Sequence, residues 1–291
     1  MQKTQAQLTL SDGRTLAYSE YGDRDPHSPV MVYCHGFPTC RMEPEIFDPI
    51  LREQGINARI IALDRPGYGG STHQPGRTFL NWPADVAEAM DMLGVGDFSI
   101  LGVSGGAPFA MACASKLGLR VSRLGIAVGI GPPAATGIEK SLIFRTAPRL
   151  HLIARIQFAL FAKGLERGQD ERIFRQTIEN LGAADVPVLE RPETKDWFIR
   201  MLRETFKQGG RAAALEAGLY VEEWGFEPTD IETETHLWYG GRDETVPPSV
   251  GEWLAERIPN STLEIWQDHG HFTWMLTEES AELIRTIASG H

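Results

Sequence analysis

Uninterrupted runs of apolar residues recur along the first half of the chain. They span residues 29–34, 58–63, 98–103 and 121–130. A strand that is covered on both faces needs apolar side chains on both sides. Runs of this length without alternation therefore predict buried strands of a parallel sheet.

Segments with helical spacing separate these runs. Within residues 79–93, Val86, Met90 and Leu93 recur on one helical face, and residues 107–117 form a second helical pattern. Strands that alternate with helices favour a doubly wound, mostly parallel α/β sheet with right-handed connections. The N-terminal segment differs, because residues 7–21 alternate around a central Asp-Gly pair. This pattern predicts a β-hairpin.

The middle of the chain is helical in pattern and shows no convincing strand from about residue 137 to residue 224. The alternation of elements resumes with predicted strands at 236–239 and 262–266, each followed by a helical pattern. We therefore predict a core in two parts, residues 1–130 and 231–291, and an inserted helical cap, residues 131–230.

Composition and charge narrow the classes of function. The chain has 291 residues and a formal net charge of −11, which disfavours binding to nucleic acid. Its three cysteines, Cys34, Cys40 and Cys113, are too few and too irregularly spaced for a disulfide framework or a zinc site. No signal peptide or apolar membrane span is visible. We therefore expect a reduced, cytoplasmic compartment.

Candidate chemistry begins at Gly102-Val103-Ser104-Gly105-Gly106, where a predicted strand meets a predicted helix. A nucleophile on such a strained turn needs small neighbours two residues away on either side, and Gly102 and Gly106 meet this need. The alternative is a glycine-rich turn in which Ser104 only caps the helix.

A serine nucleophile needs a base and a carboxylate that orients the base. Asp243 follows the predicted strand 236–239, and His271 follows the last predicted strand. Both positions lie at the carboxyl edge of the sheet, where ligands of open α/β sheets bind. His269 is an alternative base and Asp268 an alternative acid. The order Ser, Asp, His along the chain is the order of the α/β-hydrolases.

Four motifs together resemble the α/β-hydrolase superfamily, over nearly the whole chain outside the cap. They are His35-Gly36-Phe37-Pro38, the segment from Asp64 to Ser71, the turn at Ser104, and the segment from Gly241 to Pro247 with Gly270-His271-Phe272. The turn Ser104-Gly105-Gly106-Ala107-Pro108 looks like that of capped, esterase-like members with a Ser-Gly-Gly-x-Pro elbow. The resemblance implies an α/β-hydrolase fold with a helical cap.

The resemblance also implies roles for individual residues. Ser104 would be the nucleophile, His271 the base and Asp243 the acid. The backbone N–H groups of Phe37 and Gly105 would form the oxyanion hole, supported by a further set of residues: His35, Gly36, Gly102 and Gly106. Neither a cofactor nor a metal is implied. Cys34, beside His35, is an alternative nucleophile, although a buried cysteine at a strand end is the commoner arrangement.

We therefore expect a serine hydrolase that acts on a small-molecule acyl substrate: a small or medium carboxylic ester, a lactone or a related compound. One alternative is an aminopeptidase of the proline-iminopeptidase kind, which would read a free amine through acidic residues such as Glu216, Glu222 and Glu223. The basic stretch from Glu139 to Arg175 disfavours it. Cofactor-free perhydrolysis and ligand binding without catalysis are further alternatives. The sequence leaves open whether the protein is a monomer or a homodimer.

The predicted cap carries many apolar side chains, which we expect to line an acyl pocket in part. Its large aromatic residues suit either this lining or the interior of the cap: Trp197, Phe198, Trp224 and Phe226.

Overall fold

The computed structural model describes residues 4–137, 151–179 and 181–289. Part of the predicted cap lies outside these ranges. The apolar residues concerned are Leu142, Ile143, Phe144 and Leu150, and the basic residues concerned are Lys140, Arg145 and Arg149.

One sheet holds eight strands among the residues that the structure describes. The strands are β1 (Thr4–Thr9), β2 (Thr15–Gly22), β3 (Val30–Cys34), β4 (Arg59–Leu63), β5 (Phe98–Val103), β6 (Val121–Ala127), β7 (Thr235–Gly240) and β8 (Ser261–Trp266). Their order is β1-β2-β4-β3-β5-β6-β7-β8. In this order, every strand from β4 onward is parallel to its neighbour, including β3. The β1–β2 hairpin adds an antiparallel edge beside β4. The predicted mostly parallel sheet is confirmed.

The order of the strands reverses at β3. The chain passes from β3 to β4 on one side, and then returns to place β5 on the other side of β3. In open α/β sheets, ligands bind beyond the carboxyl ends of the strands at such a reversal. The loop after β3 and the turn after β5 meet there.

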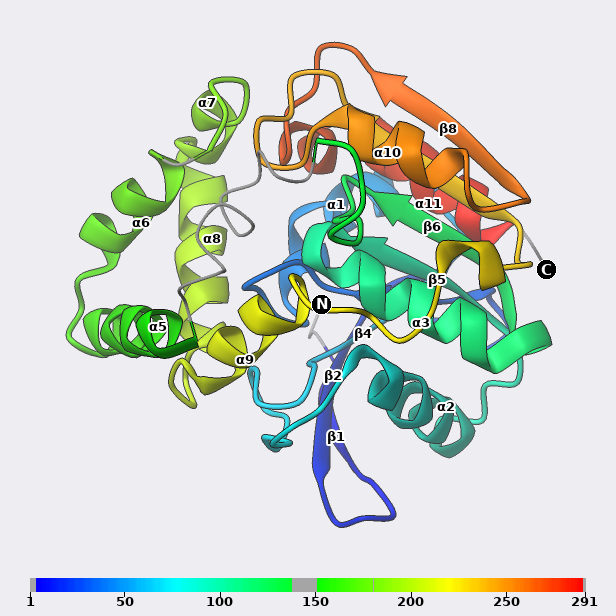
Figure 1. The fold of residues 1–291 in the computed structure, drawn as a ribbon, viewed down its shortest axis with the longest axis horizontal. Helices are drawn as coiled ribbons and strands as arrows, with labels where there is room; N and C mark the ends of the chain where they lie inside the picture. The colour runs from blue at the N-terminus through cyan, green and yellow to red at the C-terminus, as the bar shows by residue number, and fades with distance from the viewer. Residues whose placement is uncertain (1–3, 138–150, 180, 290–291) are drawn as a thin grey trace.

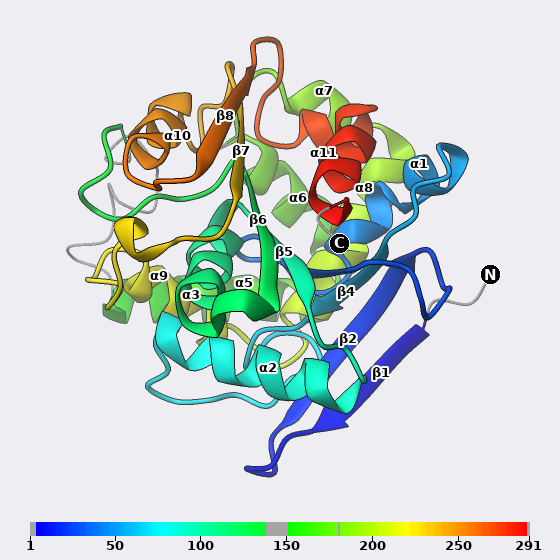
Figure 2. The ribbon, with the colours of Figure 1, turned by 90° about the vertical axis from the view of Figure 1, so that its right-hand side faces the viewer.

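Helices cover both faces of the sheet, as Figure 2 shows. On one face pack α2 (Trp82–Met92), α3 (Ala107–Leu117) and α10 (Pro248–Ala255), and on the other α1 (Asp48–Glu53) and α11 (Glu279–Ala288). Each face has its own cluster of buried apolar side chains. The short helix α1 was not predicted, because six residues are too few for a clear helical period.

The described residues between β6 and β7 form helices joined by turns and loops. The α-helices are α5 (His151–Glu166), α6 (Asp170–Ile178), α7 (Val186–Leu189), α8 (Pro192–Thr205) and α9 (Arg211–Leu219). Figure 1 shows α5 to α8 beside the sheet rather than on either of its faces. We call residues 151–219 the helical segment. It has an apolar cluster of its own, which also includes residues of the loops after β3 and β4.

Two predicted details need adjustment. The fourth run of apolar residues extends to Ile130, but β6 ends at Ala127, because the backbone turns at Val128 with φ of +46°. Trp224 and Phe226 are buried in the main core beside Phe79 rather than inside the helical segment. Trp197 and Phe198 do belong to the core of the helical segment.

Candidate active site

Ser104 lies on a sharp turn between β5 and α3, with φ of +50°. A non-glycine residue rarely adopts this conformation, and it costs roughly 1–3 kcal/mol. The neighbouring glycines make the turn sterically feasible. A Cβ on Gly106 would lie 2.0 Å from the carbonyl oxygen of Cys34, and one on Gly102 would lie 2.7 Å from Cα of Ala107.

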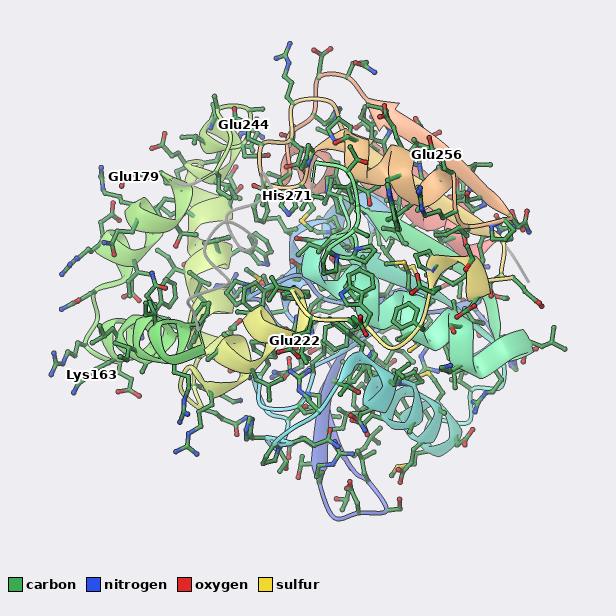
Figure 3. All side chains as sticks on the ribbon, viewed as in Figure 1. Lys163, Glu179, Glu222, Glu244, Glu256 and His271 are labelled. Carbon is green, nitrogen blue, oxygen red and sulfur yellow. The ribbon has the colours of Figure 1, made fainter. Side chains whose placement is uncertain are left out.

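The structure brings Ser104, Asp243 and His271 together. His271 Nε2 lies 2.9 Å from Ser104 Oγ, and His271 Nδ1 lies 2.7 Å from Asp243 Oδ2. All three residues are at least nine-tenths buried. Figure 3 shows His271 near the junction of the sheet and the helical segment. An imidazole that bridges a hydroxyl and a carboxylate can take a proton from the hydroxyl while the carboxylate stabilises the imidazolium.

The turn after β7 holds the carboxylate of Asp243. Its Oδ1 accepts hydrogen bonds from the N–H groups of Thr245 (2.7 Å) and Val246 (2.8 Å), which leaves Oδ2 directed at His271. The two alternative residues lie elsewhere. His269 Nε2 lies 3.5 Å from Glu279, and Asp268 forms an exposed ion pair with Arg242.

The electrostatic surroundings of His271 favour its protonated form. Burial by itself lowers the pKa of this imidazole. The charge and hydrogen bond of Asp243, together with the charges of Asp185 and Glu43, outweigh burial and raise the pKa above the ordinary 6.5.

The loop after β3 packs against the turn at Ser104. A Cβ added to Gly105 would lie 2.4 Å from Cβ of Phe37, so the backbones of these two residues are adjacent. Gly36 lies directly beside Ser104, because a Cβ on Gly36 would be 3.6 Å from the serine Cβ. The N–H of Gly36 donates to Glu43 Oε2 at 2.7 Å. Phe37 and Gly105, whose N–H groups are the predicted oxyanion donors, thus lie on two loops that touch beside Ser104.

His35 is fully buried below this loop. Its Nε2 accepts a hydrogen bond from the backbone N–H of Arg65, and its Nδ1 lies 3.0 Å from the carbonyl oxygen of Gly36. The proton is therefore on Nδ1. Burial, aided by the Arg65 guanidinium, lowers the pKa of His35 well below its usual value. A neutral ring with both nitrogens engaged can brace the loop, but it is not placed to act as a base.

A buried ionic cluster behind the loop was not predicted. Glu216 of α9 accepts hydrogen bonds from Arg65 (2.8 and 2.9 Å), from Arg77 and from Tyr68. Arg65 also donates to the carbonyl oxygens of His35 and Gly36. The carboxylate and both guanidinium groups are almost completely buried. The cluster ties the helical segment to the loop that carries the predicted oxyanion donor.

Glu43 is another buried acid near the site, and the sequence analysis did not name it. Burial raises its pKa to about 7, although the hydrogen bond from the N–H of Gly36 opposes this rise. No local pattern marked Glu43, and the sequence named Glu216 only as a possible binder of a substrate amine, not as the partner of buried arginines. The only signal was the motif from Asp64 to Ser71, which contains two of the partners of Glu216.

The alternative nucleophile Cys34 is fully buried at the end of β3. Burial raises the pKa of its thiol to about 11. The thiolate, which is the reactive form, is thus disfavoured. Cys40 and Cys113 are also buried and free.

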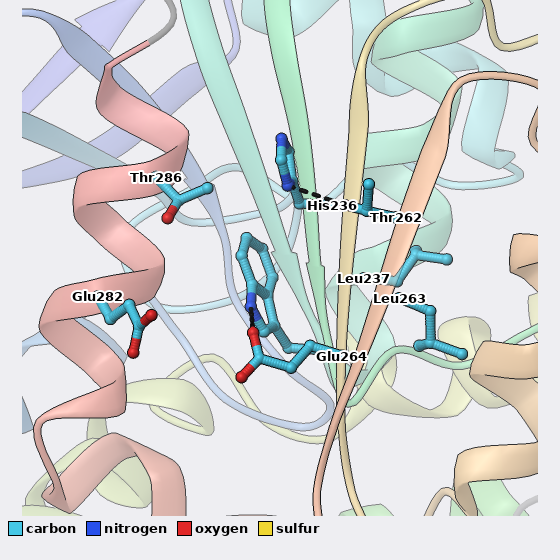
Figure 4. A pocket seen from close by; sticks show the side chains of 8 residues that line it. His236, Leu237, Thr262, Leu263, Glu264, Glu282 and Thr286 are labelled. Carbon is cyan, nitrogen blue, oxygen red and sulfur yellow. Dashed lines mark hydrogen bonds between the residues drawn. The ribbon is translucent and has the colours of Figure 1, made fainter.

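A cavity of about 240 Å³ lies far from Ser104, between α11 and the last two strands (Figure 4). His236 and Trp238 of β7 and Glu264 of β8 line it. His236 lies near the start of β7, whereas Asp243 follows the end of this strand, so the cavity and the site lie toward opposite edges of the sheet.

Among the described residues, no group of three or more His, Cys, Asp and Glu side chains can hold a metal ion. In the same part of the chain, no helix has the length and apolar character needed to cross a bilayer.

Comparison with known proteins identifies the family. Residues 29–276 match the alpha/beta hydrolase fold family. The 2-hydroxymuconate semialdehyde hydrolase of Pseudomonas putida is 27% identical over 222 residues, covering 74% of this chain and 71% of that protein. The pimeloyl-[acyl-carrier protein] methyl ester esterase of Aromatoleum aromaticum is 26% identical over 268 residues, covering 90% of this chain and 99% of that protein.

Among solved structures, an esterase from Exiguobacterium antarcticum superposes with a TM-score of 0.70 at 20% identity, covering 98% of both chains. The chain therefore belongs to the α/β-hydrolase fold family, and it is an enzyme of the hydrolase class. The predicted fold class and the resemblance to the superfamily are confirmed.

Proposed function

We propose that this enzyme is a serine hydrolase that cleaves a small or medium carboxylic ester, lactone or related acyl compound. The observation that carries the proposal is the hydrogen-bonded line from Ser104 Oγ through His271 to Asp243. The esterase named among its relatives supports an ester substrate.

The proposed reaction has two halves. His271 Nε2 takes the proton of Ser104 as the serine oxygen attacks the substrate carbonyl, and the N–H groups of Phe37 and Gly105 stabilise the oxyanion. The protonated His271 then gives its proton to the leaving alcohol, and an acyl-enzyme remains. Water, deprotonated by His271, then attacks the acyl carbon. The bond from this carbon to Ser104 Oγ breaks, the carboxylic acid leaves, and His271 returns the proton to Ser104. Asp243 keeps the imidazole oriented throughout.

Aromatic side chains beside Phe37 support an apolar acyl group. Phe158 of α5 and Tyr220, the residue directly after α9, both contact the ring of Phe37 edge to face, with centroids 5.8 and 5.2 Å away. One aromatic residue of the helical segment and one directly after it thus pack against the predicted oxyanion loop, as a cap that shapes a substrate pocket would.

One argument for the aminopeptidase alternative fails, because Glu216 is not free to bind a substrate amine. Glu216 was a candidate for binding a substrate amine. Its carboxylate is fully buried and already paired with Arg65 and Arg77, and these charges lower its pKa to about 2 despite burial. Glu222 and Glu223 are exposed. Perhydrolysis would use the same three side chains, so a substrate assay has to separate it from ester hydrolysis.

The proposal is tested by treating the protein with a fluorophosphonate and measuring its intact mass. We expect one adduct on the wild type and none on Ser104→Ala. His271→Ala should slow labelling at least ~10³-fold. His269→Ala is the matched control and should label at nearly the wild-type rate, because its ring faces Glu279. Equal labelling of the wild type and Ser104→Ala, or no labelling of folded wild type, would refute the proposed nucleophile.

A further inference from the structure

Asp185 of the helical segment reaches the loop that carries His271. The residue immediately precedes α7 and is fully buried. Its side chain does not cap α7. Instead, Oδ2 accepts a hydrogen bond from the N–H of His271 at 2.8 Å, and Oδ1 accepts one from the N–H of Phe272 at 2.7 Å. The N–H and hydroxyl of Thr273 donate to the same Oδ1 at 3.2 and 3.1 Å. One carboxylate thus binds three consecutive residues.

The shape of the loop is fitted to this carboxylate. A Cβ on Gly270 would lie 2.5 Å from both of its oxygens, so a larger residue at this position would displace Asp185 or the loop. The segment around Asp185 also covers the turn that carries Asp243, since a Cβ on Gly182 would lie 3.2 Å from Cβ of Glu244. Figure 3 shows Glu244 beside the helical segment and His271 nearby.

The charge of Asp185 acts on the imidazole. Its negative field is one of the influences that raise the pKa of His271. Among the ion pairs between described residues, none joins Asp185 to an arginine or lysine, and backbone N–H groups supply most of its hydrogen bonds. N–H groups carry no net charge, so hydrogen bonds from them do not neutralise the carboxylate, and its negative charge still stabilises a nearby cation. The imidazolium that forms during acyl transfer is such a cation.

We propose that Asp185 is a positioning residue of the active site, through which the helical segment controls the competence of His271. It fixes the backbone of residues 271–273 so that the imidazole contacts Ser104 and Asp243 at once, and its charge stabilises the imidazolium. The inference rests on the proposed function for its catalytic meaning. The geometry and the electrostatic effect on His271 can be tested without turnover.

The first test replaces Asp185 by Asn, which preserves shape but removes the charge and one acceptor. The matched control is Glu204→Gln. Glu204 is also a carboxylate of the helical segment that pairs with the core, through Arg41 at 2.7 Å, but it does not touch the loop of His271. Titration of His271 is followed by NMR of histidine-labelled protein, and labelling of Ser104 by fluorophosphonate is timed at a pH above the midpoint of that titration.

We expect Asp185→Asn to shift the titration midpoint of His271 to lower pH and to slow labelling by up to about 100-fold. Glu204→Gln should leave the titration midpoint of His271 and the rate of labelling close to their wild-type values. An unchanged midpoint in Asp185→Asn, or the same changes in both variants, would overturn the proposal, because Asp185 would then act only as a general structural support.

A second variant covers the case in which Asp185→Asn does not fold. Gly270→Ala keeps the charge but pushes the carboxylate away from the loop, and it should also slow labelling. A folded Gly270→Ala protein that labels at the wild-type rate would overturn the positioning role. If the wild type is not labelled at all while Asp185→Asn still lowers the midpoint of His271, the proposed hydrolase mechanism fails and the electrostatic role of Asp185 stands.

Discussion

At the scale of single residues, the side chains of Ser104, Asp243 and His271 meet because local backbone contacts fix the position of each. The strained turn at Ser104 presents the hydroxyl, amide donors after β7 orient Asp243, and Asp185 fixes the backbone of His271. Each contact is short and buried, so small displacements at any of them should alter proton transfer.

The raised pKa of His271 predicts the pH dependence of the reaction. If His271 is the base, as proposed, it must be unprotonated to act, so the rate of labelling at Ser104 should be low at acid pH and rise as His271 loses its proton, with a midpoint above 6.5. Because Glu43 titrates near pH 7 and its charge also acts on His271, the profile is measured in parallel on Glu43→Gln. That variant should have its midpoint at lower pH. A wild-type midpoint below 6.5 would contradict the prediction.

At the scale of elements, the junction between β5 and α3 is built on close approach of backbones. Gly106 lies against the last residues of β3, with no room for a side chain. The turn at Ser104 and the loop after β3 therefore form one closely packed unit, which carries the proposed nucleophile and both predicted oxyanion donors.

Gly106→Ala should destabilise this unit. The new Cβ would collide with the carbonyl oxygens of Cys34 and His35, and overpacking of this kind costs about 1–3 kcal/mol. Urea unfolding should show a lower free energy of unfolding, and the rate of fluorophosphonate labelling should fall. Gly96→Ala is the matched control, because nothing lies within 4 Å of its new Cβ and its backbone needs no left-handed φ. Comparable losses in the two variants would argue against a tightly packed elbow.

At the scale of the whole molecule, buried polar contacts join the helical segment to the core. Glu216 pairs with Arg65 and Arg77, and Asp185 binds the His271 loop. Removing one partner of a buried ion pair leaves an uncompensated charge, which is far more costly than losing an exposed pair. These contacts should therefore determine both stability and the position of the helical segment.

Glu216→Gln should lower the free energy of unfolding by about 3–5 kcal/mol at neutral pH, because two buried guanidinium groups lose their counter-charge. Since the pKa of Glu216 is lowered to about 2 from 4.5, its contribution is present above pH 4.5 and lost as the pH falls toward 2. The difference in the free energy of unfolding between Glu216→Gln and the wild type should therefore shrink as the pH falls from 4.5 toward 2. Glu171→Gln, which removes an exposed ion pair with Lys195, is the control for urea unfolding. Equal stability of Glu216→Gln and wild type would refute the prediction.

Much of this protein follows from local features of its sequence. Apolar runs, helical periods and the Asp-Gly turn predicted the strands, the helices on the sheet other than α1, and the helical character of the segment between β6 and β7, since each depends on residues only a few positions apart. The motifs around Ser104, Asp243 and His271 identified the three side chains that the fold brings together.

The tertiary structure alone decided what surrounds them. Asp185 lies 86 residues before His271, and Glu216 lies 151 residues after Arg65. A lone Asp before a short helix, or a lone Glu in an alanine-rich one, resembles an ordinary surface residue in the sequence. Its role depends on which groups the folded chain places against it, and neither periodicity nor spacing carries that information. The helical character of this segment is therefore recognisable from the sequence, but its contact with the loop of His271 is visible only in the fold.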